Sequence, residues 1–145
     1  MKALLQRVTT ASVRVDGVPV GAIGRGTLAL IGVEPADAVA QAERLAQRIL
    51  SYRMFPDEQG RMNRSLTESG GGLLLVSQFT LVADTRKGNR PGFSTAASPA
   101  VAEPLFNRLV ACCRTGLDRV ETGQFGADMQ VELVNDGPVT FWLSA

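Results

Sequence analysis

The segment Thr27-Leu28-Ala29-Leu30-Ile31-Gly32-Val33 decides the fold, because it is a continuous apolar run. A half-buried strand alternates apolar and polar residues, whereas a run of this kind predicts a strand covered on both faces. A second apolar run, Leu73-Leu74-Leu75-Val76, begins a stretch for which we expect another strand, over residues 73–82. The glycines near the first run match no phosphate-binding spacing, so no nucleotide-binding loop is predicted there.

The chain before this segment predicts a β-hairpin, and the chain after it predicts a helix. Residues 3–23 alternate between apolar and polar positions and are interrupted by Asp16-Gly17, a dipeptide suited to a tight turn with positive φ. Over residues 36–51, apolar side chains recur at helical spacing and charged side chains fill the other face. A short strand over residues 52–55 should follow, ended by a turn-rich segment at residues 56–60.

A second long helix is predicted in the C-terminal half. Ser98-Pro99 provides an N-cap and a first-turn proline for a helix that runs towards Gly116. Pro104 lies beyond the first turn, where its missing N–H and its ring disfavour a helix. A helix that begins near Glu103 is therefore the alternative.

Two strands complete the predicted sheet. They cover residues 129–133 and 139–143, and Gly137-Pro138 lies between them as a candidate turn. Strands and helices are interleaved along the chain without an internal repeat. This order predicts an α/β fold, a single domain over residues 1–145 with a mixed, barrel-like β-sheet and flanking helices.

The composition suits one globular domain. The chain has 145 residues, of which 45% are hydrophobic, enough to bury a core but too few for two ordinary domains. No apolar run approaches about 20 residues, so no membrane span is predicted. No signal peptide is visible at the start of the sequence, and we expect a cytoplasmic protein.

The charge balance limits how much nucleic acid the chain could hold. A net charge of +1 is unlike that of proteins that bind long stretches of nucleic-acid backbone. A smaller contact, such as one to the terminal nucleotides of an RNA, needs few basic side chains. Arg86-Lys87-Gly88-Asn89-Arg90 is the most basic stretch available for it, with a solvated loop as an equal alternative.

The chain lacks the residues that catalysis and metal binding most often use. It contains no histidine, which removes the commonest general base and every Ser-His-Asp or Cys-His arrangement. Its two cysteines, Cys112 and Cys113, are adjacent in a helical pattern, so we expect free thiols and no metal site. The hydroxyls of Ser77, Thr80 and Thr140 are candidate nucleophiles, but no base adjoins any of them in the sequence.

Two short segments place small polar side chains beside constrained backbone. Ser77-Gln78-Phe79-Thr80-Leu81 follows an apolar run, and Asn135-Asp136-Gly137-Pro138-Val139-Thr140 contains a Gly-Pro pair. Such positions can present main-chain N–H and C=O groups to a ligand. The alternatives are an ordinary strand end at the first segment and an ordinary turn at the second.

These two segments resemble the signature of the D-aminoacyl-tRNA deacylases. Leu5-Gln6-Arg7-Val8, Ala127-Asp128-Met129-Gln130-Val131 and Phe141-Trp142-Leu143 extend the resemblance in the right order along nearly the whole chain. The resemblance implies a homodimer that hydrolyses the ester between a D-amino acid and the 3′-terminal adenosine of tRNA, without metal or organic cofactor. It also allows glycyl-tRNA as a substrate.

The resemblance implies a catalytic role for one segment. Ser77, Gln78, Phe79 and Thr80 would form the floor of the active site, with the backbone at Phe79-Thr80 as oxyanion donor. The substrate's own 2′-hydroxyl would take part in the reaction, which suits a chain without histidine.

The resemblance implies a substrate-binding role for five further residues. Gly137 and Pro138, joined by a cis peptide bond, would enter the partner subunit's site and exclude L-amino acids. Arg7 would brace this pair, and Phe125 and Met129 would be walls of the pocket. Gly92 departs from the family pattern, which has serine there, so a hydroxyl role at that position is not expected.

Two other functions remain open at this point. One is a non-catalytic RNA-binding or interaction module of the same fold, which would not hydrolyse D-aminoacyl-tRNA. The other is a conventional hydrolase with a Thr80 nucleophile, which would act on small esters without any RNA.

Overall fold

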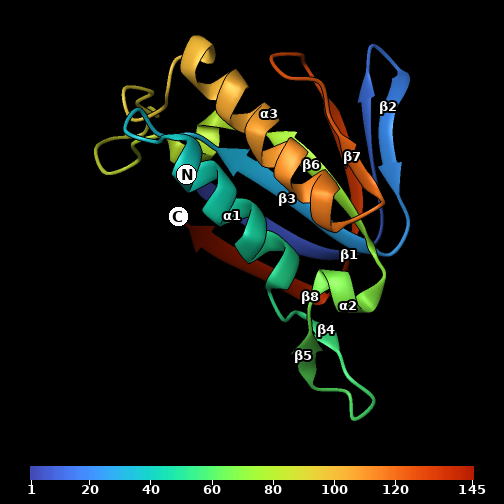
Figure 1. The fold of residues 1–145 in the computed structure, drawn as a ribbon. Helices are drawn as coiled ribbons and strands as arrows, with labels where there is room; N and C mark the ends of the chain where they lie inside the picture. Colours follow the sequence, from blue (N-terminus) through green and yellow to red (C-terminus); the bar gives the residue numbers. More distant parts are fainter.

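The structure, a computed structural model, describes all 145 residues and shows an α/β fold. Helices α1 and α3 lie side by side across one face of a six-stranded sheet (Figure 1). A small β4–β5 hairpin projects from the body of the molecule (Figure 1). The elements are β1 (Lys2–Val15), β2 (Val18–Ile23), β3 (Gly26–Gly32), α1 (Val39–Ser51), β4 (Phe55–Pro56), β5 (Met62–Arg64), α2 (Leu66–Ser69), β6 (Gly72–Ser77), the 3-10 helix η1 (Phe79–Val82), α3 (Pro99–Gly116), β7 (Val120–Thr122) and β8 (Gln130–Ser144).

The long strand β1 organises the sheet. β3 pairs with the first half of one of its edges, β2 pairs with the second half of that edge, and β8 pairs with the opposite edge. β6 and β7 continue the sheet in parallel beyond β3. β7, at the far end of this sheet, lies close to β2 of the first hairpin: a Cβ added to Gly21 of β2 would lie only 2.5 Å from the carbonyl oxygen of Thr122 of β7. The mixed, barrel-like sheet predicted from the sequence is therefore confirmed.

β3 separates two apolar clusters, which explains its continuous apolar sequence. Leu28 lies in the interior of the nearly closed sheet with Val13 and Leu74. Its neighbours Ala29 and Ile31 lie in the larger cluster between the sheet and the helices. The expectation that this strand is covered on both faces is confirmed.

The N-terminal hairpin is also confirmed, and α1 begins later than predicted. The turn residues Asp16 and Gly17 both have positive φ, 51° and 78°. α1 begins at Val39 and not near residue 36, because Asp37 closes a turn with Glu34. The Glu34 main-chain N–H donates to an Asp37 carboxylate oxygen at 2.7 Å, and the Asp37 N–H donates to the Glu34 carbonyl at 3.1 Å.

The strand expected over residues 52–55 is shorter and later than predicted. β4 contains only Phe55 and Pro56, which pair with Arg64 and Met62 of β5 to form the small hairpin. Asp57 closes the connection by accepting hydrogen bonds from the main-chain N–H groups of Gln59 and Arg61. These bonds, that from Arg61 foremost, lower the pKa of the Asp57 carboxyl.

The strand expected over residues 73–82 ends early, at Ser77. The Gln78 N–H still donates to the Ile31 carbonyl at 2.7 Å, but the next four residues form η1. In this short helix the Leu81 N–H donates to the Gln78 carbonyl, at 3.2 Å. The apolar residues of the helix resemble a strand continuation in the sequence, and only the local hydrogen bonds reveal the turn.

α3 begins at Pro99, with Ser98 as N-cap, so the start near Glu103 is wrong. Pro104 lies inside the helix, where it leaves the carbonyl of Ala100 without its usual donor; Ala100 is exposed, so water can replace that donor. Cys112 and Cys113 on this helix are free thiols, as expected, and burial raises the pKa of Cys113 to about 12. No helix combines the length and the apolar character needed to cross a membrane.

The two strands predicted at the C-terminus are one strand, β8. Leu133 pairs with Ala11 and Phe141 pairs with Leu5, so both halves lie along β1. The register shifts between these pairs, at the residues around Gly137-Pro138. The Gly-Pro pair is therefore a bulge within a continuous strand and not a turn between two strands.

Candidate active site

A cavity of about 610 Å³ opens at the carboxyl ends of the parallel strands β3 and β6. Its wall is mostly apolar, and it is completed by η1, the start of α3 and the segment before β8. Carboxyl ends of strands are common ligand sites in α/β sheets. The lining residues are Ile31, Val33, Val76, Ser77, Gln78, Phe79, Phe93, Ala96, Ala97, Ser98, Pro99, Ala102, Phe106, Phe125, Gly126, Ala127, Asp128, Met129 and Val131.

The cavity brings together five of the residues singled out in the sequence. Ser77, Gln78 and Phe79 line it from the end of β6 and the start of η1, and Phe125 and Met129 line it from the segment before β8. The ring of Phe125 packs against Phe106 of α3, with 6.2 Å between the ring centroids. The two segments therefore line one cavity, although about 50 residues separate them in the sequence.

The mouth of the cavity carries a pair of exposed aromatic rings. Phe79 is 56% exposed and Phe93 is 46% exposed, and their ring centroids are 5.1 Å apart. Phe93 was not predicted from the sequence as a site residue. Its only sequence signal is an aromatic residue that directly follows Pro91-Gly92, which is too common to indicate a pocket.

Thr80 is exposed on η1 and does not line the cavity. Its hydroxyl oxygen accepts a hydrogen bond from the Gln78 side-chain amide. An amide N–H is a donor and cannot remove the hydroxyl proton, so this contact does not activate Thr80 as a nucleophile. The Thr140 hydroxyl likewise accepts from an amide, that of Gln6, at 3.4 Å.

The Gly137-Pro138 peptide bond is cis, and Arg7 holds the bulge that contains it. The Arg7 Nε donates to the carbonyl oxygen of Asp136 at 3.2 Å and also lies 3.2 Å from its carboxylate. The Arg7 Nη1 donates to the Met54 carbonyl at 2.8 Å. Because the Arg7 side chain is only 12% exposed, these contacts are shielded from water and hold the bulge against the start of the β4–β5 hairpin.

Asn135 closes the bulge from its other side, a role that was not predicted from the sequence. Its side-chain amide donates to the Arg7 carbonyl at 2.9 Å and to the Val139 carbonyl at 3.0 Å. One amide group thus fixes the separation between the two ends of the bulge. An asparagine two residues before Gly-Pro is the signal that could have indicated it, since asparagine side chains commonly bond to nearby backbone.

The bulge and the cavity are two separate groups within one chain. None of Arg7, Gly137 and Pro138 lines the cavity, and no residue of the segment 135–138 does so. Gly137 and Pro138 are exposed. The residues to which the resemblance assigns catalytic or substrate-binding roles are therefore divided between two surfaces of the chain.

Comparison with known proteins decides the family. The model of the D-Tyr-tRNA(Tyr) deacylase family matches residues 4–144. The chain belongs to this family. A D-aminoacyl-tRNA deacylase of Xanthomonas axonopodis pv. citri (strain 306) is 69% identical over 144 residues, which cover 99% of each chain.

Two solved structures have the same fold as this chain. The structure named c-Myc DNA unwinding element binding protein matches with a TM-score of 0.95 and 40% identity, covering 100% of this chain and 99% of the other. A probable eukaryotic D-amino acid tRNA deacylase matches with a TM-score of 0.86 and 18% identity, covering 99% and 98%. The family and the relatives establish the activity as D-aminoacyl-tRNA deacylation, a hydrolysis with tRNA as substrate.

Proposed function

We propose that the cavity holds the 3′-terminal aminoacyl-adenosine of a D-aminoacyl-tRNA, and that a second copy of the chain completes the site. The observation that carries this proposal is the division of the site residues between a cavity and an exposed bulge. Gly137 and Pro138 cannot screen a substrate in a cavity that they do not line. A partner's bulge placed over the cavity mouth would do so, and its backbone would exclude L side chains while admitting D-amino acids and glycine.

In this arrangement the apolar cavity positions the ester, and main-chain groups stabilise its transition state. The N–H groups of Phe79 and Thr80 begin η1, and the first N–H groups of a helix have no acceptor within the helix. They are the donors that we assign to the developing oxyanion, at about 3 to 4 kcal/mol for a well-placed donor. Water attacks the ester carbonyl, the bond to the ribose oxygen breaks, and that oxygen takes a proton to give free tRNA and a D-amino acid.

The test of this function is the pair of hydrolysis rates on one tRNA charged with the D- and the L-form of the same amino acid. We expect the D-ester and glycyl-tRNA to be hydrolysed and the L-ester to remain. An RNA-binding module without turnover would hydrolyse neither ester. A hydrolase of small esters would act equally well on an ester without RNA, and would not need the cavity to fit adenosine.

The surface that we assign to the partner lies on the face of β1 and β8 away from the helices. Leu143 is buried under the helices, so its neighbour Trp142 points to the opposite face, where it is 51% exposed. Trp142 pairs in register with Leu4, and Thr140 pairs with Gln6 on the same face. β8 also leaves its outer edge without a partner strand. An exposed tryptophan beside an open strand edge is typical of an interface.

We expect light scattering to give twice the chain mass of 15.4 kDa, and Trp142→Glu to shift the protein to the monomer and to lower deacylation. A buried carboxylate without a partner at an interface is strongly unfavourable. Val39→Glu is the matched control, because Val39 is also 51% exposed but lies on α1. A fully active monomer would overturn the proposal that a second copy completes the site.

A further inference from the structure

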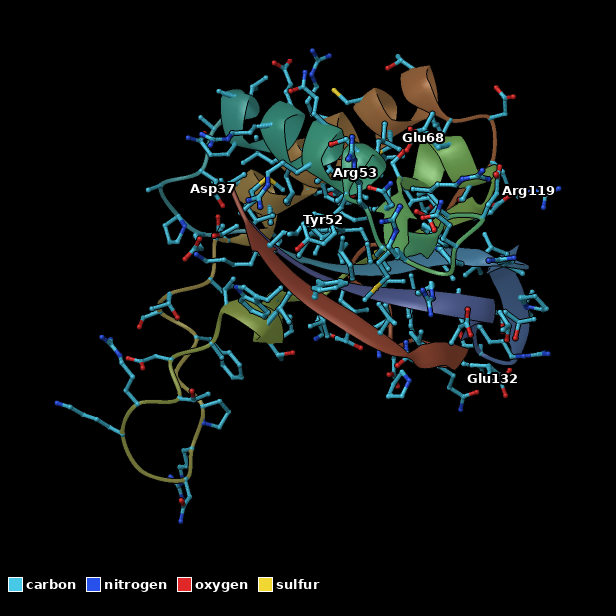
Figure 2. The ribbon with its side chains drawn as sticks, turned by 90° about the horizontal axis from the view of Figure 1, so that it is seen from below. Asp37, Tyr52, Arg53, Glu68, Arg119 and Glu132 are labelled. Carbon is cyan, nitrogen blue, oxygen red and sulfur yellow. The ribbon has the colours of Figure 1, made fainter.

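The loop between η1 and α3 carries the positive excess of the chain. Within residues 84–92, which we call the basic loop, Asp84 contributes one negative charge and Arg86, Lys87 and Arg90 contribute three positive charges. The loop therefore has a net charge of +2, whereas the whole chain has +1, so the remaining residues sum to −1. The positive charge is thus concentrated in the basic loop. This loop extends away from the body of the molecule (Figure 2).

Backbone hydrogen bonds hold the base of the basic loop beside the cavity. The main-chain groups of Asp84 and Gly92 exchange two hydrogen bonds, of 2.8 and 2.9 Å. The Thr95 hydroxyl donates to the Val82 carbonyl at 2.6 Å, which joins the residues that flank this pair in the sequence. Phe93, the residue after this closure, lines the cavity mouth. A ligand that leaves the cavity past Phe93 thus meets the basic loop next.

Two of the three cationic side chains in the basic loop are free to bind an anion. Arg86 donates through Nε and Nη2 to the two carboxylate oxygens of Asp84, each at 2.8 Å, and these hydrogen bonds hold the pKa of Asp84 well below its usual range. Asp84 is thereby neutralised within the loop. Lys87 and Arg90 are exposed and form no ion pair.

The exposed rings beside the basic loop indicate what kind of anion approaches. Phe79 and Phe93 at the cavity mouth are each about half exposed. Exposed aromatic rings next to unpaired cationic side chains are typical of surfaces that bind single-stranded nucleic acid, because bases stack on the rings and phosphates contact the cations. An inorganic anion or an acidic peptide would use the cations but would have no need of the rings.

We propose that the basic loop binds the phosphodiester backbone of the single-stranded acceptor end of the tRNA, through Lys87 and Arg90. The proposal rests on the proposed function, in which the terminal adenosine occupies the cavity. The nucleotides that precede the adenosine then leave past Phe79 and Phe93 and place their phosphates against the loop. These interactions are equal in the ground state and the transition state, so they lower KM and leave kcat unchanged.

The test compares Lys87→Ala/Arg90→Ala with the wild type on two substrates, D-aminoacyl-tRNA and the D-aminoacyl ester of adenosine alone. We expect KM for the tRNA to rise about tenfold at low salt with kcat unchanged. The magnitude of the slope of log(kcat/KM) against log[salt] should fall by about 1.4, which is about 0.7 for each single-strand phosphate that the loop no longer neutralises. The adenosine ester carries no phosphate, so its kinetics should not change.

Two further variants complete this experiment. Lys87→Arg/Arg90→Lys keeps both charges and should behave as the wild type. Arg44→Ala/Arg114→Ala removes two exposed, unpaired cations from α1 and α3 and should leave the salt slope unchanged. Unchanged tRNA kinetics in the loop variant, or an equal loss on both substrates, would overturn the assignment. Failure of the wild type to hydrolyse D-aminoacyl-tRNA would instead overturn the proposed function.

Discussion

Gly137→Ala should reduce hydrolysis of D-aminoacyl-tRNA by about 100-fold, since a displacement of about 1 Å in a substrate-positioning group is enough for a loss of that size. A Cβ at this position would lie 2.7 Å from Val139 Cγ2, 3.0 Å from the Val139 nitrogen and 3.3 Å from Arg7 Nη2. The residue also has a φ of +134°, which L side chains rarely adopt. The bulge must therefore shift, and with it the backbone that we assign to the partner's cavity.

The variant should remain folded. Gly137 is exposed, and backbone strain of this kind costs about 1 to 3 kcal/mol, against about 5 to 15 kcal/mol for the stability of a typical domain. Initial rates on D- and L-charged tRNA, with circular dichroism as the check on folding, measure the effect.

Gly17→Ala is the matched control for Gly137→Ala. Gly17 also has positive φ, +78°, but an added Cβ there would have no atom within 4 Å. The substitution introduces the same kind of backbone strain far from the bulge, so we expect near wild-type rates. Wild-type activity and full D-selectivity in Gly137→Ala would show that chirality is read elsewhere.

Individual strands could be predicted where sequence pattern and environment coincide. The continuous apolar run of β3 reflects apolar clusters on both of its faces. The Asp16-Gly17 turn reflects a backbone conformation with positive φ, which few residue types adopt readily. β8 could not be predicted as one strand, because Gly137-Pro138 is a strong turn signal in the sequence. Its continuity depends on pairing with β1, which lies more than 100 residues away and leaves no local trace.

The candidate site was predictable only in part, for a similar reason. The resemblance identified Ser77–Phe79 and Phe125, which the fold brings to one cavity. The position of the Gly137-Pro138 bulge outside the cavity of its own chain agrees with what the resemblance implies, but no residue pattern in the sequence indicates it, because it depends on the pairing of β8 with β1. The asparagine before Gly-Pro is a sequence signal for a side-chain bond to nearby backbone, but it does not identify the acceptors, one of which, the Arg7 carbonyl, is 128 residues away in the sequence.

A tRNA that ends in 2′-deoxyadenosine should lose about 100-fold or more in D-ester hydrolysis, whereas Thr80→Ala should keep most of the wild-type rate. Proton transfer by a positioned group contributes about 10²- to 10⁴-fold. No histidine exists in this chain, and the Thr80 hydroxyl accepts from an amide and meets no base. We therefore assign to the neighbouring ribose 2′-hydroxyl the proton or hydrogen bond that the leaving 3′-oxygen needs.

Single-turnover rates with saturating enzyme decide between the substrate's hydroxyl and that of Thr80, because they report the chemical step without product release. The 2′-deoxy terminus confines the ester to the 3′-oxygen, and an unchanged KM would show that it still binds. Thr80→Ser serves as the control that keeps a hydroxyl at the same position. If Thr80→Ala abolished the reaction, Thr80→Ser restored it and the 2′-deoxy substrate reacted normally, Thr80 would be the nucleophile. The reverse pattern assigns the proton transfer to the RNA, and then a chain without histidine needs only backbone donors and a cavity of the right shape.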